Sequence, residues 1–380
     1  MKRKTKSNVC LLLIVCLLTT VLLGGCDSGK TDAVSVSGRA ILHEKEFGGV
    51  YIDLSIEDFN ALGFAYGDSV SVVFSNGYAL EKLPYYNGYY TQTGQPLLVA
   101  YPGYPYIKAC INNGDDLWTL AGLTENDTAE ITLSECGAYA AIQNARDIHY
   151  EDDRTLFPSD AVFANFRSVS VTGLKEDTLY RSASPCDNQH NRASYADSLI
   201  KEAGVKCILN LSDNEEKLQG YIGGEDFNSP YFLSLYNNGN VIPLALNMNY
   251  GSAEFREKVA AGLIQMSEQE GPYLVHCTEG KDRTGFVCML LEALCGASYQ
   301  EIVDDYMITY DNYYKITKES DAERYDVIVE NVLDPMLRSM VGDDAADLTT
   351  ADLAGCAADL LLDAGMTEAQ LAALKAKLGA

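Results

Sequence analysis

Residues 273–295 constrain the fold of this chain more than any other stretch. A short apolar run, residues 273–276, leads through the polar loop CTEGKDR into residues 284–295, which are apolar on nearly every side. The first run predicts a buried strand and the second a central, buried helix. Strand, loop and helix in this order favour an α/β domain with a parallel sheet. The loop would then lie at the carboxyl end of the strand, where such sheets bind ligands.

Other segments extend the pattern and add a second domain. Residues 204–211 predict another strand and residues 252–269 a helix. Residues 39–148 differ, because short apolar runs alternate there with turn pairs, which are Asn76-Gly77, Asn87-Gly88, Pro102-Gly103 and Asn113-Gly114. Asn-Gly is the strongest short hairpin signal, and frequent short strands indicate a small barrel or sandwich.

The predicted fold class is therefore α/β, with a central, mostly parallel sheet and flanking helices, preceded by a small all-β, barrel-like domain. We assign residues 39–148 to the β-domain and residues 150–380 to the α/β domain. Tyrosines are frequent in residues 85–90 and 101–106. They are either half-buried strand side chains or a recognition surface for sugars or peptides.

The N-terminus has the features of an export signal. Four basic residues precede the apolar run 9–23, which is shorter than the roughly 20 residues of a membrane span. The run ends in Leu23-Gly24-Gly25-Cys26, which resembles the bacterial lipoprotein signal. The resemblance implies a signal peptide over residues 1–25, lipidation of Cys26 and a linker to residue 38. The protein would then be anchored to the outer face of the cytoplasmic membrane. A plain secretory signal and an uncleaved anchor are the alternatives.

The amino-acid composition limits the kinds of ligand and partner that the protein can bind. The net charge is −26, which argues against nucleic acid as a partner because phosphate backbones require clustered Lys and Arg. An anionic ligand must therefore be held by local cations. The eleven cysteines show neither a CxxC pair nor metal-ligand spacing, so we expect no metal and no cofactor.

The loop that follows the strand has the chemistry of an anion site. Backbone N–H groups from Cys277 to Arg283 can point at one centre, and Gly280 relieves the sharp turn. The next helix adds the positive end of its dipole, and Arg283 supplies a planar fork for two phosphate oxygens. The same groups favour the thiolate form of Cys277. The expected phosphate-binding residues are Thr278, Glu279, Gly280, Lys281, Asp282 and Arg283.

These residues resemble the Cys-x5-Arg-Thr signature of protein tyrosine phosphatases, and Gly-Lys-Asp-Arg-Thr-Gly resembles the bacterial tyrosine and lipid phosphatases. Three further segments resemble the family, namely Asn165-Phe166-Arg167, Leu179-Tyr180-Arg181-Ser182 and residues 304–309. The resemblance covers roughly residues 160–380 and implies a cysteine phosphatase fold. It implies that Cys277 is the nucleophile, that Arg283 stabilises the transition state, that Thr284 hydrogen-bonds the departing thiolate and that His276 orients the loop.

The general acid is less evident. Classical members carry an Asp on an upstream loop, but residues 242–251 contain no carboxylate. Asp282 is the nearest candidate, as lipid phosphatases with an Asp before the Arg suggest, and its alternative role is a hydrogen bond to the loop. Asp213 and Asp226 are the other candidates. One departure lies nearby, because Asn210-Leu211-Ser212 stands where the family has Asp-Leu-Arg.

Several other residues keep two interpretations. Lys281 either binds a second phosphate or raises the local potential. His190 either lines the pocket or is structural, and Arg181 either lines the pocket or pairs with an acidic neighbour. Cys207 is either a buried strand cysteine or a disulfide partner for Cys277 on oxidation.

The predicted function is an exported cysteine phosphatase that acts on phosphotyrosine in a phosphorylated protein, on a phosphoinositide, or on both, through a phosphocysteine intermediate. The alternatives are a phytate phosphatase and a surface phosphate-binding or ligand-binding protein of weak activity. A rhodanese-like sulfurtransferase is disfavoured, since its active loop is shorter by a residue. The β-domain also has a diffuse resemblance, over residues 62–70, 95–99 and 111–114, to the small C-terminal barrel of S-adenosylmethionine hydroxide adenosyltransferases.

Overall fold

The computed structural model describes residues 34–379, and these belong to one contact unit. The predicted signal peptide, the lipidation site Cys26 and most of the linker lie outside the described residues. Within residues 34–379, none of the helices has both the length and the apolar character needed to cross a membrane.

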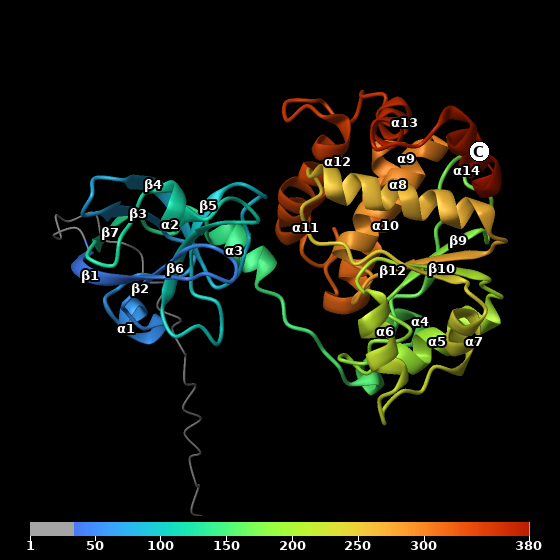
Figure 1. Ribbon diagram of the computed structural model, residues 1–380, viewed down its shortest axis with the longest axis horizontal. Coiled ribbons are helices and arrows are strands. Elements are labelled where there is room, and N and C mark those ends of the chain that lie inside the picture. The colour runs from blue at the N-terminus through green and yellow to red at the C-terminus, as the bar shows by residue number, and fades with distance from the viewer. Residues whose placement is uncertain (1–33, 380) are drawn as a thin grey trace, which may run out of the picture. The chain divides into compact units, whose positions relative to one another are not determined.

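The first part of the described chain is a closed barrel of seven strands, which confirms the predicted barrel-like domain (Figure 1). The barrel closes because the first half of β1 pairs with β7 and the second half pairs with β2. Two short helices, α1 (Ile56–Ala61) and α2 (Leu117–Leu120), accompany the strands. In barrel order the strands are β1 (Ser35–His43), β2 (Val50–Ile52), β6 (Ile107–Ile111), β5 (Pro96–Val99), β4 (Ala79–Tyr86), β3 (Ser69–Phe74) and β7 (Thr128–Glu135).

The turn pairs predict the barrel connections only in part. Asn76-Gly77 joins β3 and β4 in the expected antiparallel hairpin. The expectation of a hairpin at Asn87-Gly88 is wrong, because β4 and β5 run parallel. A parallel pair requires a crossover rather than a two-residue turn, and residues 87–95 supply it. Tyr85 and Tyr86 are fully buried, which favours the structural interpretation for these two tyrosines.

The second part has a five-stranded, mostly parallel sheet, as the sequence predicts. Its order is β11-β10-β12-β9-β8, and only the edge strand β8 runs antiparallel to its neighbour. The central strand is β12, so its carboxyl end is flanked by the ends of two parallel strands. The strands are β8 (Arg167–Ser168), β9 (Leu179–Ser182), β10 (Cys207–Asn210), β11 (Val241–Pro243) and β12 (Tyr273–His276).

Helices cover both faces of this sheet (Figure 1). Alternate strand residues point to opposite faces. Leu209 and Val275 join one core with α8, α9 and α10, whereas Ile208 and Leu274 join a second core with α5, α6 and α7. The helices of this part are α4 (Asp160–Phe163), α5 (Ala193–Glu202), α6 (Glu215–Ile222), α7 (Pro230–Asn237), α8 (Ala253–Glu268), α9 (Asp282–Cys295), α10 (Tyr299–Tyr314), α11 (Ala322–Ile328), α12 (Asp334–Val341), α13 (Leu353–Asp363) and α14 (Glu368–Leu378), with a 3-10 turn at Arg154–Leu156 and a π-helical turn at Val329–Leu333.

The central helix α9 is buried along its length, as its composition predicts. Every residue from Thr284 to Cys295 is buried. The helix begins at Asp282, two residues before the predicted start, and Gly296 ends it in the left-handed conformation with φ 97°. The earlier start places the Asp282 carboxyl group in the first turn of the helix, at the positive end of its dipole.

Helix α3 (Ala140–Arg146) packs against both parts of the chain. Ala145 belongs to the core that contains α9, whereas Ile142 packs with the barrel residues. The Gln143 side chain donates to the Asn87 Oδ1 atom at 2.8 Å and accepts from the Asn87 backbone N–H at 3.3 Å. These contacts fix the rotation of α3 and hence the direction of its last side chain, Arg146.

We expect Leu291→Ala, in the buried centre of α9, to lower the free energy of unfolding by about 2–5 kcal/mol, since it removes apolar contacts and leaves a cavity. The measurement is urea unfolding followed by circular dichroism. Leu156→Ala is the matched control, because Leu156 is 63% exposed, and it should change the stability by less than about 0.5 kcal/mol. Equal effects of the two substitutions would contradict the assigned core.

Candidate active site

The loop between β12 and α9 has the form of a cradle around the buried Cys277. Gly280 adopts φ +71°, and a Cβ atom there would lie 2.2 Å from the Ser182 carbonyl oxygen. Only glycine fits this position, because an L side chain would meet both backbone strain and a clash. Gly285 is also required, since a Cβ atom would lie 2.5 Å from the Tyr306 ring. The two glycines therefore let the loop and the helix approach β9 and α10 closely.

A buried ion cluster holds the loop from beneath. Arg181 on β9 donates from Nη2 to the Gly280 carbonyl at 3.0 Å and from Nη1 to Asp305 Oδ2 at 2.5 Å. Arg167 donates from Nε to Asp305 Oδ1 at 2.9 Å. Asn165 donates to the Gly280 carbonyl at 3.3 Å. Arg181 thus pairs with an acidic neighbour, as one of the two interpretations of this residue expected. Its side chain also supports the loop by binding the backbone carbonyl of Gly280.

The charges of this cluster are defined by burial and by neighbouring groups. Burial alone would raise the pKa of Asp305, but the Arg167 and Arg181 guanidinium groups outweigh it and hold that pKa well below its usual range. Burial raises the pKa of the neighbouring Glu292, and the Asp305 charge raises it further, so this carboxyl group is neutral. Two cations and one anion therefore share the interior.

The family-like segments meet in this cluster. Asn165 and Arg167 come from one segment, Arg181 from the second and Asp305 from the third. Two further residues support this cluster: Thr309, at the end of the third segment, and Asn312, which the sequence pattern did not select. Thr309 accepts from Asn165 at 3.1 Å, and Asn312 donates to Asn165 at 2.9 Å. Both follow Asp305 on the same helix at intervals of three to four residues. This spacing places them on the same helix face as Asp305 and could have identified them from the sequence.

On the outer side of the loop, the Glu279 carboxylate accepts a hydrogen bond from a tyrosine and pairs with a lysine. The Tyr150 hydroxyl donates to the Glu279 carboxylate. Lys281 Nζ donates to the Tyr150 hydroxyl at 3.0 Å and lies 3.3 Å from the Glu279 carboxylate. The Tyr313 hydroxyl donates to the Glu279 carbonyl at 2.7 Å. The Lys281 ammonium group is therefore engaged within the protein, which argues against its side chain as the holder of a second phosphate.

His190 fixes the segment that carries Tyr150. Its Nδ1 atom lies 3.1 Å from the Asp152 carboxylate, which also accepts from Arg192 at 2.7 Å. Its ring packs against Tyr150 with centroids 4.8 Å apart. These contacts support the structural interpretation of His190.

The residues next to Cys277 and Arg283 are buried or anchored. His276 is fully buried, and its Nδ1 atom lies 3.1 Å from the Cys277 carbonyl oxygen. Burial lowers the pKa of His276 to about 4, so the ring is neutral. The Thr284 hydroxyl is buried and has no hydrogen-bond partner within residues 34–379. Arg283 donates from Nη1 to the Leu246 carbonyl at 3.2 Å, so the carboxylate-free segment 242–251 orients the arginine.

The three candidate acids differ in their surroundings. The Asp213 carboxylate is buried and accepts from Asn210 at 3.0 Å, from Ser212 at 3.3 Å and from Tyr221 at 3.4 Å. Asp226 is exposed on the segment after α6. Asp282 lies beside the loop lysine, with Oδ2 3.7 Å from Lys281 Nζ, and lines a cavity. Only Asp282 of the three combines the loop with open space for a substrate.

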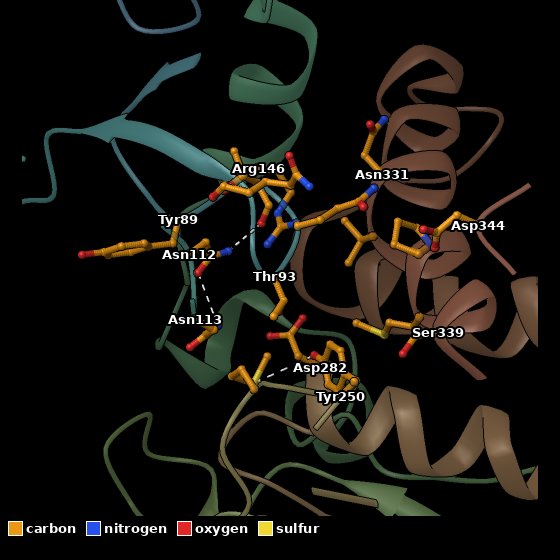
Figure 2. Close-up of a pocket in the computed structure, with 18 residues that line it drawn as sticks. Tyr89, Thr93, Asn112, Asn113, Arg146, Tyr250, Asp282, Asn331, Ser339 and Asp344 are labelled. Carbon is orange, nitrogen blue, oxygen red and sulfur yellow. Dashed lines mark hydrogen bonds between the residues drawn. The ribbon is translucent and has the colours of Figure 1, made fainter. Parts of the chain in front are cut away.

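That cavity has a volume of about 450 Å³ and adjoins the first turn of α9. Figure 2 shows Arg146 and Asn331 along one side and Asp282 and Tyr250 along the other. Burial raises the pKa of Tyr250, and the charges of Asp282, Arg146, Cys277 and Arg283 also act on its hydroxyl. Tyr250 therefore lies within electrostatic range of the loop and of Arg146. The lining residues are Tyr89, Thr91, Gln92, Thr93, Gln95, Asn112, Asn113, Arg146, Met248, Tyr250, Gly251, Asp282, Asn331, Val332, Pro335, Met336, Ser339 and Asp344.

Comparison with known proteins decides the family. Residues 139–380 match the family model described as the tyrosine phosphatase family. The chain belongs to this family. The match includes α3 as well as the sheet, the loop and all the later helices of this tyrosine phosphatase family member.

Individual relatives match over short stretches. A tyrosine-protein phosphatase of Nostoc commune is 45% identical over 60 residues, which are 16% of this chain and 20% of the relative. A putative tyrosine-protein phosphatase of Cupriavidus necator is 39% identical over 59 residues, which are 15% of this chain and 22% of the relative. The chain thus covers about a fifth of the length of these curated relatives.

Two solved structures also show similarity, at low scores. The core catalytic domain of the PP-IP phosphatase SIW14 from S. cerevisiae, in complex with citrate, has a TM-score of 0.27 and 21% identity, over 44% of this chain and 85% of that chain. A variant of P. aeruginosa TpbA in complex with pTyr has a TM-score of 0.28 and 16% identity, over 51% of this chain and 94% of that chain.

The sheet register excludes the suggested disulfide between Cys207 and Cys277. Cys207 pairs with Tyr273 at the start of β12, and Cys277 follows four residues further along. At roughly 3.3 Å per residue, the two Cα atoms are about 13 Å apart. A disulfide requires Cα atoms within about 7 Å. Cys207 is the buried strand cysteine of the other interpretation.

No group of three or more His, Cys, Asp or Glu side chains with metal-site geometry occurs within residues 34–379.

The neutral state of His276 predicts a pH-dependent stability. Its folded-state pKa of about 4 lies below the ordinary value of 6.5, so its contribution is present above pH 6.5 and is lost as the pH falls toward 4. We expect His276→Gln to be less stable than the wild type at pH 7, and the gap should narrow by about 3 kcal/mol at pH 4. Urea unfolding at several pH values measures this gap. A gap that stays constant from pH 7 to pH 4 would show that His276 is not buried as a neutral ring.

Proposed function

We propose that this protein is a cysteine-dependent phosphomonoesterase that works through a phosphocysteine intermediate. The observation that carries the proposal is the buried Cys277 at the base of a glycine-shaped loop, with Arg283 in the first turn of the helix that follows. Backbone N–H groups and the helix dipole at this position favour both a bound phosphate and a thiolate. Membership of the tyrosine phosphatase family supports the same chemistry.

The proposed reaction has two steps. The Cys277 thiolate attacks phosphorus, the bond from phosphorus to the substrate oxygen breaks, and Asp282 gives a proton to the departing oxygen. A water molecule then attacks the phosphocysteine, Asp282 takes up a proton, and the sulfur–phosphorus bond breaks to release phosphate and the thiolate. The phosphate oxygens are held by the backbone N–H groups of residues 278–283 and by the Arg283 fork. The buried Thr284 hydroxyl is available to stabilise the thiolate in both steps.

We propose phosphotyrosine or phosphoinositides as the substrates, with phytate as the alternative inositol phosphate. The cavity beside Asp282 favours the inositol compounds, because neutral amides and hydroxyls line much of it and suit a hydroxylated ring. We further propose that the protein is exported and lipid-anchored through Cys26, as the N-terminal sequence predicts.

Replacing the nucleophile separates catalysis from binding. We expect Cys277→Ser to reduce phosphate release below about 1% of the wild-type rate, because a serine hydroxyl in this cradle is a far weaker nucleophile than a thiolate. Calorimetry should still detect binding of inorganic phosphate or vanadate. Cys356→Ser, on the partly exposed α13, is the control and should retain activity. Residual turnover well above 1% in Cys277→Ser would remove Cys277 as the nucleophile.

The assignment of the acid predicts a leaving-group effect. We expect Asp282→Asn to slow phenyl phosphate, a poor leaving-group substrate, by about 10²–10⁴-fold and p-nitrophenyl phosphate by much less, because only the former requires a proton in the transition state. Steady-state kinetics with the two substrates measures the ratio. Asp226→Asn is the exposed control, and Asp213→Asn tests the buried alternative. If Asp282→Asn slows both substrates equally, another group is the acid.

A further inference from the structure

Arg146, the last residue of α3, forms no ion pair with a carboxylate within residues 34–379, but its guanidinium group lies within electrostatic range of the Asp282 carboxylate. None of the ion pairs or side-chain hydrogen bonds of that part of the chain includes its guanidinium group, which lies 5.4 Å from the centroid of the Tyr90 ring. A half-buried arginine normally pairs with a carboxylate or with an anionic ligand. The described contacts leave its donors available to a ligand.

The arginine faces the cavity that begins at Asp282. It lines the same 450 Å³ space as Asp282 and Tyr250, and Figure 2 shows these residues on facing sides. Asp282 of the loop and Arg146 of α3 line the same cavity, so a molecule of moderate size that fills it can contact both residues. A volume of this size is typical of sites for small ligands.

The position of Arg146 is fixed before any ligand binds. Ala145, its neighbour in the sequence, is fully buried in the core with α9, and Gln143 is held by two hydrogen bonds to Asn87. A cation held on a rigid element loses less side-chain entropy on binding than a mobile surface residue does. The backbone of Arg146 is thus held in place beside the cavity.

The other cations near the loop are already engaged. Lys281 is paired with Glu279 and Tyr150, and Arg283 belongs to the cradle that holds the reacting phosphate. If a substrate carries a second anionic group, Arg146 is the cation along this cavity that remains for it. The surrounding amides and hydroxyls of Asn112, Asn331 and Ser339 suit the hydroxyl groups of a ring between the two anions.

We propose that Arg146 forms a second phosphate subsite, which gives this site a preference for hydroxylated-ring substrates that carry a second phosphate, such as inositol bisphosphates. The inference rests on the proposed phosphatase function, because it uses the same loop for the reacting phosphate. It adds a specificity-determining residue that lies outside the loop, on α3.

Binding to the Cys277→Ser protein tests the subsite without turnover. The probes are a soluble inositol bisphosphate, an inositol monophosphate and a short-chain phosphatidylinositol bisphosphate, with affinities measured by calorimetry. We expect the bisphosphate to bind at least tenfold more tightly than the monophosphate, since a bidentate guanidinium–phosphate contact is a strong charge-assisted interaction. Arg146→Ala should remove at least ten-fold of the bisphosphate affinity and much less of the monophosphate affinity.

Further variants separate a specific contact from general electrostatics. Arg146→Gln keeps the length of the side chain and should lose the preference as Arg146→Ala does, whereas Arg146→Lys should retain part of it because the charge remains. Lys201→Ala removes an exposed cation on α5, which packs on the opposite face of the sheet from α9, and should leave the preference unchanged. If only the lipid-linked bisphosphate depends on Arg146, the second phosphate belongs to a membrane headgroup.

The result that overturns the inference is an equal affinity of the Arg146→Ala and parent proteins for the bisphosphate, or an equal loss for the bisphosphate and the monophosphate. Absence of bisphosphate binding to the parent protein also overturns it. Steady-state rates of the protein with Cys277 intact then test the phosphatase function separately. Arg146-dependent binding without turnover of any probe or of phenyl phosphate would refute the phosphatase function and leave the subsite standing.

Discussion

The ion cluster around Asp305 is the interaction on which the rest of the site depends. The Asp305 carboxylate pairs with two arginines, Arg167 from β8 and Arg181 from β9. Arg181 also donates a hydrogen bond to the Gly280 carbonyl and so links the ion cluster to the loop. Three elements that lie far apart in the sequence are thereby tied to the turn of the loop. The closeness of Gly280 to Ser182 means that this turn cannot shift without breaking these bonds. The position of Cys277 at the end of the central strand follows from the same constraint.

Such a cluster fixes the position of the loop more than it stabilises the folded protein. Removing charges from water costs several kcal/mol per ion, and mutual attraction within the interior offsets that cost only when the geometry is good. Here Asp305 is matched by two guanidinium groups, and Glu292 stays neutral because a second carboxylate would face both burial and the Asp305 charge. The cluster therefore has one favourable charge state, and that state holds the loop backbone in one position.

The local patterns of the sequence predicted the elements but not their distant neighbours. The strand and helix around Cys277 follow from apolar runs, and the barrel follows from short runs with turns, because both depend on residues close in sequence. The parallel pairing of β4 and β5 could not be predicted, since the crossover of residues 87–95 resembles a hairpin turn at its start. The engagement of Lys281 was equally hidden, because Tyr150 lies more than a hundred residues away in the chain and reaches the loop only in the folded protein.

The acidity of the whole chain makes the local arrangement of cations necessary. At physiological ionic strength charges are screened beyond about 8 Å. Although the net charge of the chain is −26, a bound anion is therefore affected mainly by the charged side chains nearest to it. Near the loop the negative side chains are balanced by positive ones. Lys281 offsets the charge of Glu279, and Arg167 and Arg181 together more than offset the charge of Asp305. The side chains that line the cavity include one cation, Arg146, and two carboxyl groups, those of Asp282 and Asp344. Such a chain repels anions at long range, so the proposed phosphate sites depend on the short-range charges of Arg283 in the loop and of Arg146 on α3.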